Sequence, residues 1–376
     1  MVHGRSSTTL TTALKTSRSE AGAEPAPRLI VDLSVIQSNF ARLQALAPHA
    51  RAGAVVKANA YGLGAAEVVP ALADAGCRTF YVAHTSEGRE ARDALGDREA
   101  DIFVFNGFWP SELSALRDAN LFPVLNDLQQ IDEISRLAPD LPCALHIDTG
   151  MSRLGLDPVE TERLLADRAC LDGLDIRQIM SHLACADEVA HPLNAEQLER
   201  FKRLRAAFPD IPASLSNSAG ILLGPDYHFD VLRPGLALYG GAPAPGADFD
   251  VCVEIEAPVL QVRTLRPGDT VGYGATYTAA TDMRVATVAA GYADGILRAC
   301  GEGGMARLGE HRVPILGRVS MDLITVDLSA IDRPVEPGEH VRFLGPELEP
   351  LAAHAHAISY ELLVRLGLRF NRVYRS

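Results

Sequence analysis

Lysine is scarce in this chain of 376 residues. Only Lys15, Lys57 and Lys202 are present, against 32 arginines. Arginine therefore does the general work of a positive surface charge, for which either residue would serve. Lys57 lies at the end of an apolar segment, so it needs an explanation of its own. The first explanation to consider is that Lys57 performs a reaction that arginine cannot perform.

Long apolar runs, paired cysteine motifs and an excess of positive charge are missing as well. No apolar stretch reaches the ~18–20 residues of a membrane span, so we expect no membrane partner. The six cysteines are scattered without a CxxC pair, which favours reduced cysteines in a cytoplasm and no metal site. The formal net charge of −13 argues against nucleic acid as a partner.

The first 27 residues are rich in Ser, Thr and Ala and contain no continuous hydrophobic stretch. A secretory signal needs about 7–15 apolar residues in a row. Glu20 and Glu24 break the acid-poor pattern of a transit peptide. We therefore expect residues 1–27 to form a disordered tail ahead of a globular protein.

Short apolar runs alternate with helical patterns between residues 50 and 240. Such alternation predicts right-handed βαβ units and a parallel sheet. Eight strands in this length favour an α/β fold with a closed (β/α)8 TIM-type barrel, which we place at 28–245. The expected strands are 52–57, 78–83, 101–105, 121–125, 143–148, 177–182, 212–216 and 229–233.

The pattern changes after GGAPAPGADFD at 240–250, which is typical of a linker. Beyond it, alternating apolar and polar residues are separated by turn signals such as RPGD and EPGE. We therefore expect a mainly antiparallel β domain at 246–376. The strand at 29–33 precedes the barrel, and it could pair with this second domain.

Lys57 ends the apolar run of AVVKANAYGLG and opens a turn. In a TIM-type barrel the carboxyl ends of the strands build the active site. A lysine there can simply extend to solvent. Its scarcity and the polar, glycine-rich residues that follow favour catalysis. A partly desolvated lysine can form a Schiff base with an aldehyde cofactor.

Other expected strand ends carry polar residues too. Taken singly, each of these polar residues could have a purely structural role. His182 could be a core histidine, Ser218 could be a helix N-cap, and Arg233 could pair with a structural carboxylate. Together they place many polar groups on one rim. The loops after strands seven and eight often hold a phosphate in this fold. With a reactive lysine, this combination favours pyridoxal 5′-phosphate. The rim residues are His146, Asp148, Arg153, His182, Asn217, Ser218, Arg233 and Gly235.

Aromatic and polar residues near glycines also stand out in the β domain. Tyr273 lies between two glycines in VGYGATY, and Tyr292 follows a glycine in AAGYADG. Met321 and Asp322 follow a strand in RVSMDL. For an isolated tyrosine in a strand, a place in the core is the simpler interpretation.

These motifs, in this order, resemble those of the alanine racemases, pyridoxal-phosphate enzymes of fold type III. The resemblance covers about 28–376. It rests on AVVKANAYGLG, DTGMSRLG, SHLACADE, NSAG, LRPGLALYG, VGYGATY, GYADG and SMDLITVD. It implies an isomerase that interconverts L- and D-alanine in a homodimer whose active site is shared between subunits. It leaves open whether D-alanine is made as a peptidoglycan precursor or degraded.

The resemblance also implies roles for single residues. Lys57 would bind the cofactor and serve the D face of alanine, and Tyr273 of the other subunit would serve the L face. His182 and Arg233 would form a hydrogen-bonded chain with that tyrosine and the pyridine nitrogen. The residues expected around the phosphate are Tyr61, Asn217, Ser218, Gly235, Leu236 and Tyr360. Those expected around the substrate are Arg153, Tyr292, Met321 and Asp322.

His146 departs from the family pattern, in which many members have a carbamylated lysine that orients the arginine. Histidine carries no stable carbamate, so Arg153 must be held by an anion or by His146 itself. An amino-acid racemase of broader specificity is the nearest alternative function. A decarboxylase of the same fold and a non-enzymatic pyridoxal-phosphate carrier are more distant ones, because the former uses a partner cysteine and the latter lacks a β domain.

Overall fold

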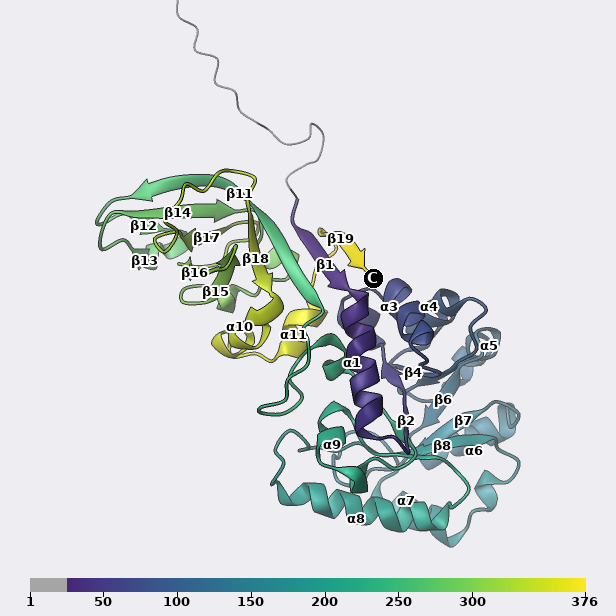
Figure 1. Ribbon diagram of the computed structural model, residues 1–376. Helices are drawn as coiled ribbons and strands as arrows, with labels where there is room; N and C mark the ends of the chain where they lie inside the picture. The colour runs from purple at the N-terminus through teal and green to yellow at the C-terminus, as the bar shows by residue number, and fades with distance from the viewer. Residues whose placement is uncertain (1–25) are drawn as a thin grey trace, which may run out of the picture.

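The computed structural model describes residues 26–376. All but the last two residues of the tail expected over 1–27 therefore lie outside the described residues. The described chain forms two units, an α/β unit and a β-rich unit, with β1 and β19 near their junction (Figure 1). Within 26–376, no helix combines the length and the apolar character needed to cross a bilayer.

The first unit is built on a seven-stranded parallel sheet in which β3 to β9 follow one another in chain order. Its strands are short and mostly buried, as parallel strands covered by helices should be. They are β3 (Ala54–Val55), β4 (Thr79–Val82), β5 (Asp101–Val104), β6 (Phe122–Leu125), β7 (Cys143–His146), β8 (Ile176–Met180) and β9 (Ala213–Ser214).

The remaining strand position closes this sheet into a barrel. Gly53 divides the first expected strand into β2 (Arg51–Ala52) and β3, and β2 pairs in parallel with β10 (Val231–Leu232). The Gly53 amide donates to Leu232 O at 2.9 Å, and the Arg233 amide donates to Ser216 O at 2.9 Å. These bonds join β10 to both of its neighbours, which confirms the predicted (β/α)8 barrel.

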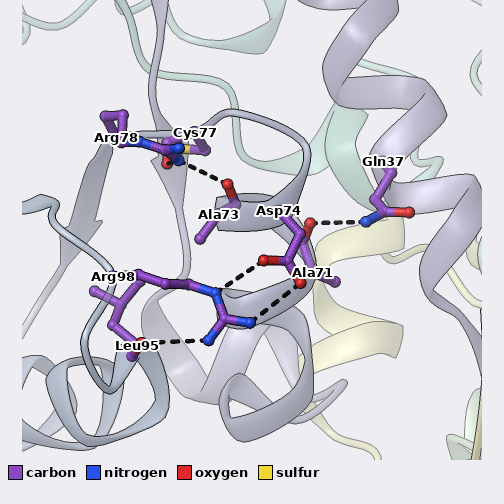
Figure 2. A network of polar contacts seen from close by, with 8 residues as sticks. All are labelled: Gln37, Ala71, Ala73, Asp74, Cys77, Arg78, Leu95 and Arg98. Carbon is purple, nitrogen blue, oxygen red and sulfur yellow. Dashed lines mark hydrogen bonds and ion pairs between the residues drawn. The ribbon is translucent and has the colours of Figure 1, made fainter.

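Helices surround the barrel: α1 (Leu33–Leu46), α3 (Ala65–Asp74), α4 (Thr85–Leu95), α5 (Leu113–Asp118), α6 (Leu128–Leu137), α7 (Pro158–Ala166), α8 (Pro192–Ala207) and α9 (Ser218–Leu222). Polar contacts tie α1, α3 and α4 together on the outer layer (Figure 2). Gln37 donates to Ala71 O at 2.9 Å, and Arg98 binds both carboxylate oxygens of Asp74, at 2.8 and 3.2 Å. Such exposed pairs contribute only modestly to stability.

The second unit is an antiparallel β-barrel, which confirms the predicted mainly antiparallel β domain and adds that its sheet is closed. Its strands alternate buried and less buried residues, and β14 pairs with both β17 and β11, which closes the ring. In spatial order the ring consists of β11 (Val253–Leu265), β14 (Met283–Val288), β17 (Ile324–Asp327), β16 (His311–Leu316), β15 (Met305–Leu308) and β18 (His340–Leu344). A small hairpin adds β12 (Thr270–Val271) and β13 (Tyr277–Thr278), and α10 (Leu348–His354) and α11 (Ser359–Val364) follow the ring.

The two ends of the described chain meet at this sheet. β1 (Arg28–Asp32) pairs antiparallel with β11 on one side and parallel with β19 (Asn371–Arg375) on the other. The strand expected at 29–33 therefore joins the sheet of the second unit before the chain enters the first. Asp32 then caps α1 by accepting from Val35 N at 3.1 Å. Residues far apart in sequence thus connect the two units.

Candidate active site

Lys57 lies at the carboxyl end of β3 and begins a short turn of unusual hand, α2 (Lys57–Tyr61). The residues after it are left-handed, with φ of 53° at Ala58, 56° at Asn59, 52° at Ala60 and 55° at Tyr61. Each such residue costs about 1–2 kcal/mol, so the turn stores on the order of 4–8 kcal/mol. Strain of this kind persists only where neighbours compensate for it, and it occurs often at functional sites.

The barrel supplies part of that compensation. The Ala58 amide donates to Glu87 Oε1 at 2.7 Å, and the Ala65 amide donates to Asn59 Oδ1 at 2.7 Å. Glu87 also accepts from the amides of Ala83 and His84. One carboxylate therefore joins the turn after β3 to the turn after β4.

A cavity of about 320 Å³ opens beside Lys57 at the carboxyl ends of the strands. Its lining includes four residues that were predicted from the sequence to form the site: Lys57, Arg153, His182 and Arg233. His146, where this chain departs from the family pattern, lines it as well. Burial and the positive charge of Arg153 lower the pKa of the Lys57 ammonium, although Glu87 partly opposes this. At neutral pH, more of a lysine in this state is the free amine, which can attack a carbonyl carbon or accept a proton, than of a surface lysine.

Arg233 is the most constrained charge in the cavity wall. It is 3% exposed, and burial lowers the pKa of its guanidinium to about 10, so it remains a cation at neutral pH. Its two terminal nitrogens donate to Ser214 Oγ and to Ser181 O. Its Nε is buried and has no partner among residues 26–376. A buried donor of this kind needs an acceptor from outside the described chain.

His182 stands next to this guanidinium at the end of β8. Burial and the charge of Arg233 hold its pKa well below the usual histidine range. The imidazole is therefore neutral at physiological pH. In a chain of hydrogen bonds through His182 and Arg233, the positive charge would reside on the arginine.

His146 is held in one tautomer by Asn126. The amide nitrogen of Asn126 donates to Phe105 O at 2.9 Å and to Val124 O at 2.8 Å, so its oxygen faces His146 Nδ1 at 2.8 Å. Nδ1 must then carry the hydrogen. Burial and the charges of Arg233 and Arg153 lower the His146 pKa to about 4. The ring is neutral, and Nε2 is left as an acceptor.

A second group of expected site residues gathers around Gly235, in the loop after β10. Ser218 Oγ accepts from the amides of Gly235 and Ala237 at 2.9 and 3.3 Å. A Cβ on residue 235 would lie 2.3 Å from the Tyr61 hydroxyl oxygen, so only glycine allows this approach. The ring of Tyr61 lies 5.8 Å from that of Tyr360. Hydroxyls and glycine backbone thus converge here, as an anion requires.

One expectation about this group was wrong. The N-cap of α9 is Asn217, whose side chain accepts from Gly220 N at 2.8 Å, and not Ser218. Ser218 is the first helical residue, and its hydroxyl turns to the loop after β10. Leu236 begins the 3-10 turn η4 (Leu236–Tyr239) in that loop and is buried.

The remaining expected residues lie on the second unit and do not line the Lys57 cavity. Tyr273, in η5 (Tyr273–Ala275), is 74% exposed, Met321 is 53% exposed, and Tyr292, in η6 (Tyr292–Asp294), is 43% exposed. The Tyr292 amide donates to Ser320 O, and the next amide donates to Met321 O, which fixes these two loops together. The Asp322 carboxylate is occupied by Arg369 at 2.7 Å. Within one chain, these residues therefore lie outside the Lys57 cavity.

Sequence reasoning missed several residues of the site. Asn106 and Asn126 follow β5 and β6 in the same way that His182 follows β8, so the rule of polar residues at strand ends could have found both. Phe105 and Met180 line the cavity and gave no polar signal. Lys57 Nζ lies 6.0 Å from the centre of the Phe105 ring.

A larger cavity of about 560 Å³ lies between α7, α8 and the loop after β7. Asp148, Arg200 and Arg203 line it, but no lysine, histidine or cysteine does. Asp148 already accepts from the amides of Gly150, Met151 and Ser152. This cavity is the larger of the two, but only the cavity at Lys57 is lined by a lysine and histidines that could act as an active site.

Known proteins resemble this chain over nearly its whole length. Two family models match, "Alanine racemase, N-terminal domain" at 31–243 and "Alanine racemase, C-terminal domain" at 252–374. An alanine racemase of Rhodospirillum rubrum is 47% identical over 92% of this chain and 95% of its own length. A catabolic alanine racemase of Agrobacterium fabrum is 44% identical over 96% of this chain and 95% of its own length.

Solved structures that resemble this chain are alanine racemases as well. The alanine racemase of Bartonella henselae, with covalently bound pyridoxal phosphate, has a TM-score of 0.87 and 36% identity, covering 93% of this chain and 99% of its own. The biosynthetic alanine racemase of Pseudomonas aeruginosa has a TM-score of 0.86 and 36% identity, covering 94% of this chain and 100% of its own. This chain belongs to the alanine racemase family.

Proposed function

We propose that this protein is a pyridoxal-phosphate-dependent racemase that interconverts L-alanine and D-alanine. The observation that carries the proposal is a cavity lined both by a lysine with a lowered pKa and by Arg233, whose buried Nε has no hydrogen-bond partner among residues 26–376. The two family models and the relatives give the reaction class.

The residues around the cavity fit this cofactor at both of its ends. Lys57 would bind its aldehyde carbon, and Arg233 Nε would donate to its ring nitrogen. Tyr61, Ser218, the backbone at Gly235 and Leu236, and Tyr360 would hold its phosphate, with Asn217 shaping the start of α9. When bound, pyridoxal phosphate withdraws electrons from the α-carbon of the amino acid, which makes the α-proton removable.

Racemisation needs a proton to leave one face of the α-carbon and another to arrive on the opposite face. Lys57 Nζ would take and return the proton on the D-alanine face, and Tyr273 Oη would do so on the L-alanine face. Because Tyr273 is exposed and lies outside the Lys57 cavity, it would serve the cavity of a second copy. Further exposed apolar residues of the second unit, such as Met321 and Leu323, support contact with such a copy. We infer a homodimer with shared active sites, in which Tyr292 would lie at the substrate entrance and Met321 and Asp322 near the substrate carboxylate.

Arg153 would bind the carboxylate of alanine. It makes no ion pair within the described part of the chain, and it shares the cavity with His146. We infer that His146 Nε2 accepts from the Arg153 guanidinium and thereby positions it. A neutral acceptor can do this, because the His146 pKa of about 4 keeps the ring uncharged beside a cation.

Replacing His146 with leucine should raise KM for alanine on the order of tenfold and change kcat less, since a bond that positions Arg153 acts on bound substrate and transition state alike. His146→Gln should retain most of the wild-type KM, because its amide can donate to Asn126 and still accept from Arg153. Steady-state kinetics of both variants would measure this. A large fall in kcat with an unchanged KM would show that His146 has another role.

Incubation of the purified protein with single L-amino acids, followed by chiral chromatography, tests the proposed function. We expect D-alanine to form from L-alanine until the two enantiomers are equal. Conversion of L-serine or larger amino acids at comparable rates would favour the broader-specificity racemase. Release of carbon dioxide would favour the decarboxylase, and no conversion of L-alanine would refute the proposal.

A further inference from the structure

We propose that Arg372 and Tyr374, on the C-terminal strand β19, are positioning residues that hold the left-handed turn after Lys57 in its working shape. The inference rests on the proposed function, because that turn carries both Lys57 and Tyr61. According to this inference, the C-terminal strand helps to hold the cofactor site in shape.

The contacts are direct and come from one face of the strand. Arg372 Nη1 donates to Gly62 O at 2.7 Å, and the Tyr374 hydroxyl donates to Leu63 O at 3.0 Å. A Cβ on residue 64 would lie 2.1 Å from the Tyr374 oxygen, so the phenol rests against the exit of the turn. Two residues of β19 thus touch the three consecutive residues that directly follow the turn.

The two carbonyls depend on these side chains. Gly62 and Leu63 are buried. Among residues 26–376, the carbonyl oxygens of Gly62 and Leu63 accept hydrogen bonds only from Arg372 and Tyr374 of β19. A buried carbonyl without a partner is costly. The left-handed turn carries strain as well. Losing either bond therefore favours relaxation of the turn away from its observed shape.

β19 is fixed firmly enough to act as a support. It pairs with β1 along all five of its residues, and β1 pairs with β11 of the second unit. The second unit approaches the turn from another side as well, because a Cβ on residue 62 would lie 2.3 Å from Leu363 O of α11. The turn after Lys57 is thus held between the barrel and the C-terminal unit.

Three variants of the holoenzyme test the inference. Tyr374→Phe removes one hydroxyl, and Arg372→Met removes the guanidinium while it keeps the apolar stem. Arg375→Met is the matched control, because Arg375 lies on the opposite face of β19, is exposed and does not contact the turn. The readouts are hydrogen exchange of the peptide covering 57–64, with β14 and β17 as internal reference, and the rate of cofactor release followed by visible circular dichroism.

We expect exchange in 57–64 and cofactor release to rise about fivefold in Tyr374→Phe and in Arg372→Met, the effect of one lost hydrogen bond. Arg375→Met should match the wild type. Equal exchange in all three variants would overturn the inference, and so would faster exchange spread evenly over β14 and β17. If the wild type fails to racemise alanine, the proposed function fails, whereas exchange of the turn in the cofactor-free protein still decides this inference.

Discussion

Lys57→Arg should lower the rate of alanine racemisation by roughly 10⁴-fold or more and abolish the covalent bond to pyridoxal phosphate. Arginine keeps the positive charge and much of the length of lysine. Its guanidinium is delocalised and always protonated, so it neither attacks an aldehyde carbon nor accepts a proton at neutral pH. Chiral product analysis measures the rate, and borohydride reduction followed by peptide mass mapping shows whether residue 57 is labelled.

Lys202→Arg is the matched control for this change. Lys202 lies on α8, where it pairs with Glu199 at 3.0 Å on the exposed face of the helix. Arginine can make the same pair, so activity and labelling should stay at the wild-type level. Retention of activity in Lys57→Arg, or a borohydride label on Lys202, would refute the assigned site.

The position of Lys57 could be predicted because its signal is local. A lysine at the end of a buried strand, followed by glycines, has few other interpretations in a barrel, and the strand ends of a parallel barrel all meet at one rim. His182, Arg233 and Ser218 were found by the same rule. Asn126 follows the rule too, but its role depends on two carbonyls and on His146, and sequence spacing does not show which groups it would meet.

Other parts of the site depend on contacts between distant segments. Residues 58–61 are ordinary L-amino acids, and nothing in ANAY predicts four left-handed residues in a row. Their conformation is maintained by Glu87, which lies 29 residues from Ala58, and by Arg372, which lies 310 residues from Gly62. Local preference therefore predicts a right-handed conformation for residues 58–61, and their left-handed conformation arises only from contacts in the assembled fold.

Tyr273→Phe should reduce racemisation by roughly 10³-fold while Lys57 can still move a proton on its own face. In D₂O, the variant should exchange the α-hydrogen of D-alanine for deuterium without inverting it. L-alanine should remain undeuterated, because the phenol that would remove its proton is gone. Mass spectrometry of the separated enantiomers measures both outcomes.

Exchange of the α-hydrogen for deuterium distinguishes the two bases better than the rates of conversion between the enantiomers do. The equilibrium constant between two enantiomers is one, so kcat/KM must fall equally in both directions whichever base is lost. Exchange of the α-hydrogen has no such constraint, because it needs one base only. Tyr277→Phe is the matched control, since Tyr277 carries a phenol four residues away that is bonded to Met283 Sδ at 3.4 Å. Equal deuteration of both enantiomers by Tyr273→Phe would contradict the two-base assignment.

Mixing the two inactive variants tests whether Tyr273 serves the cavity of a partner. When Lys57→Arg and Tyr273→Phe subunits are unfolded and refolded together in equal amounts, about half of the dimers contain one of each. In such a dimer, one shared site carries both substitutions and the other carries none. Activity should therefore return to about a quarter of the wild-type value. If Tyr273 acted within its own chain, every site would keep one substitution and the mixture would stay inactive. The exposed position of Tyr273, outside the Lys57 cavity, favours the first result.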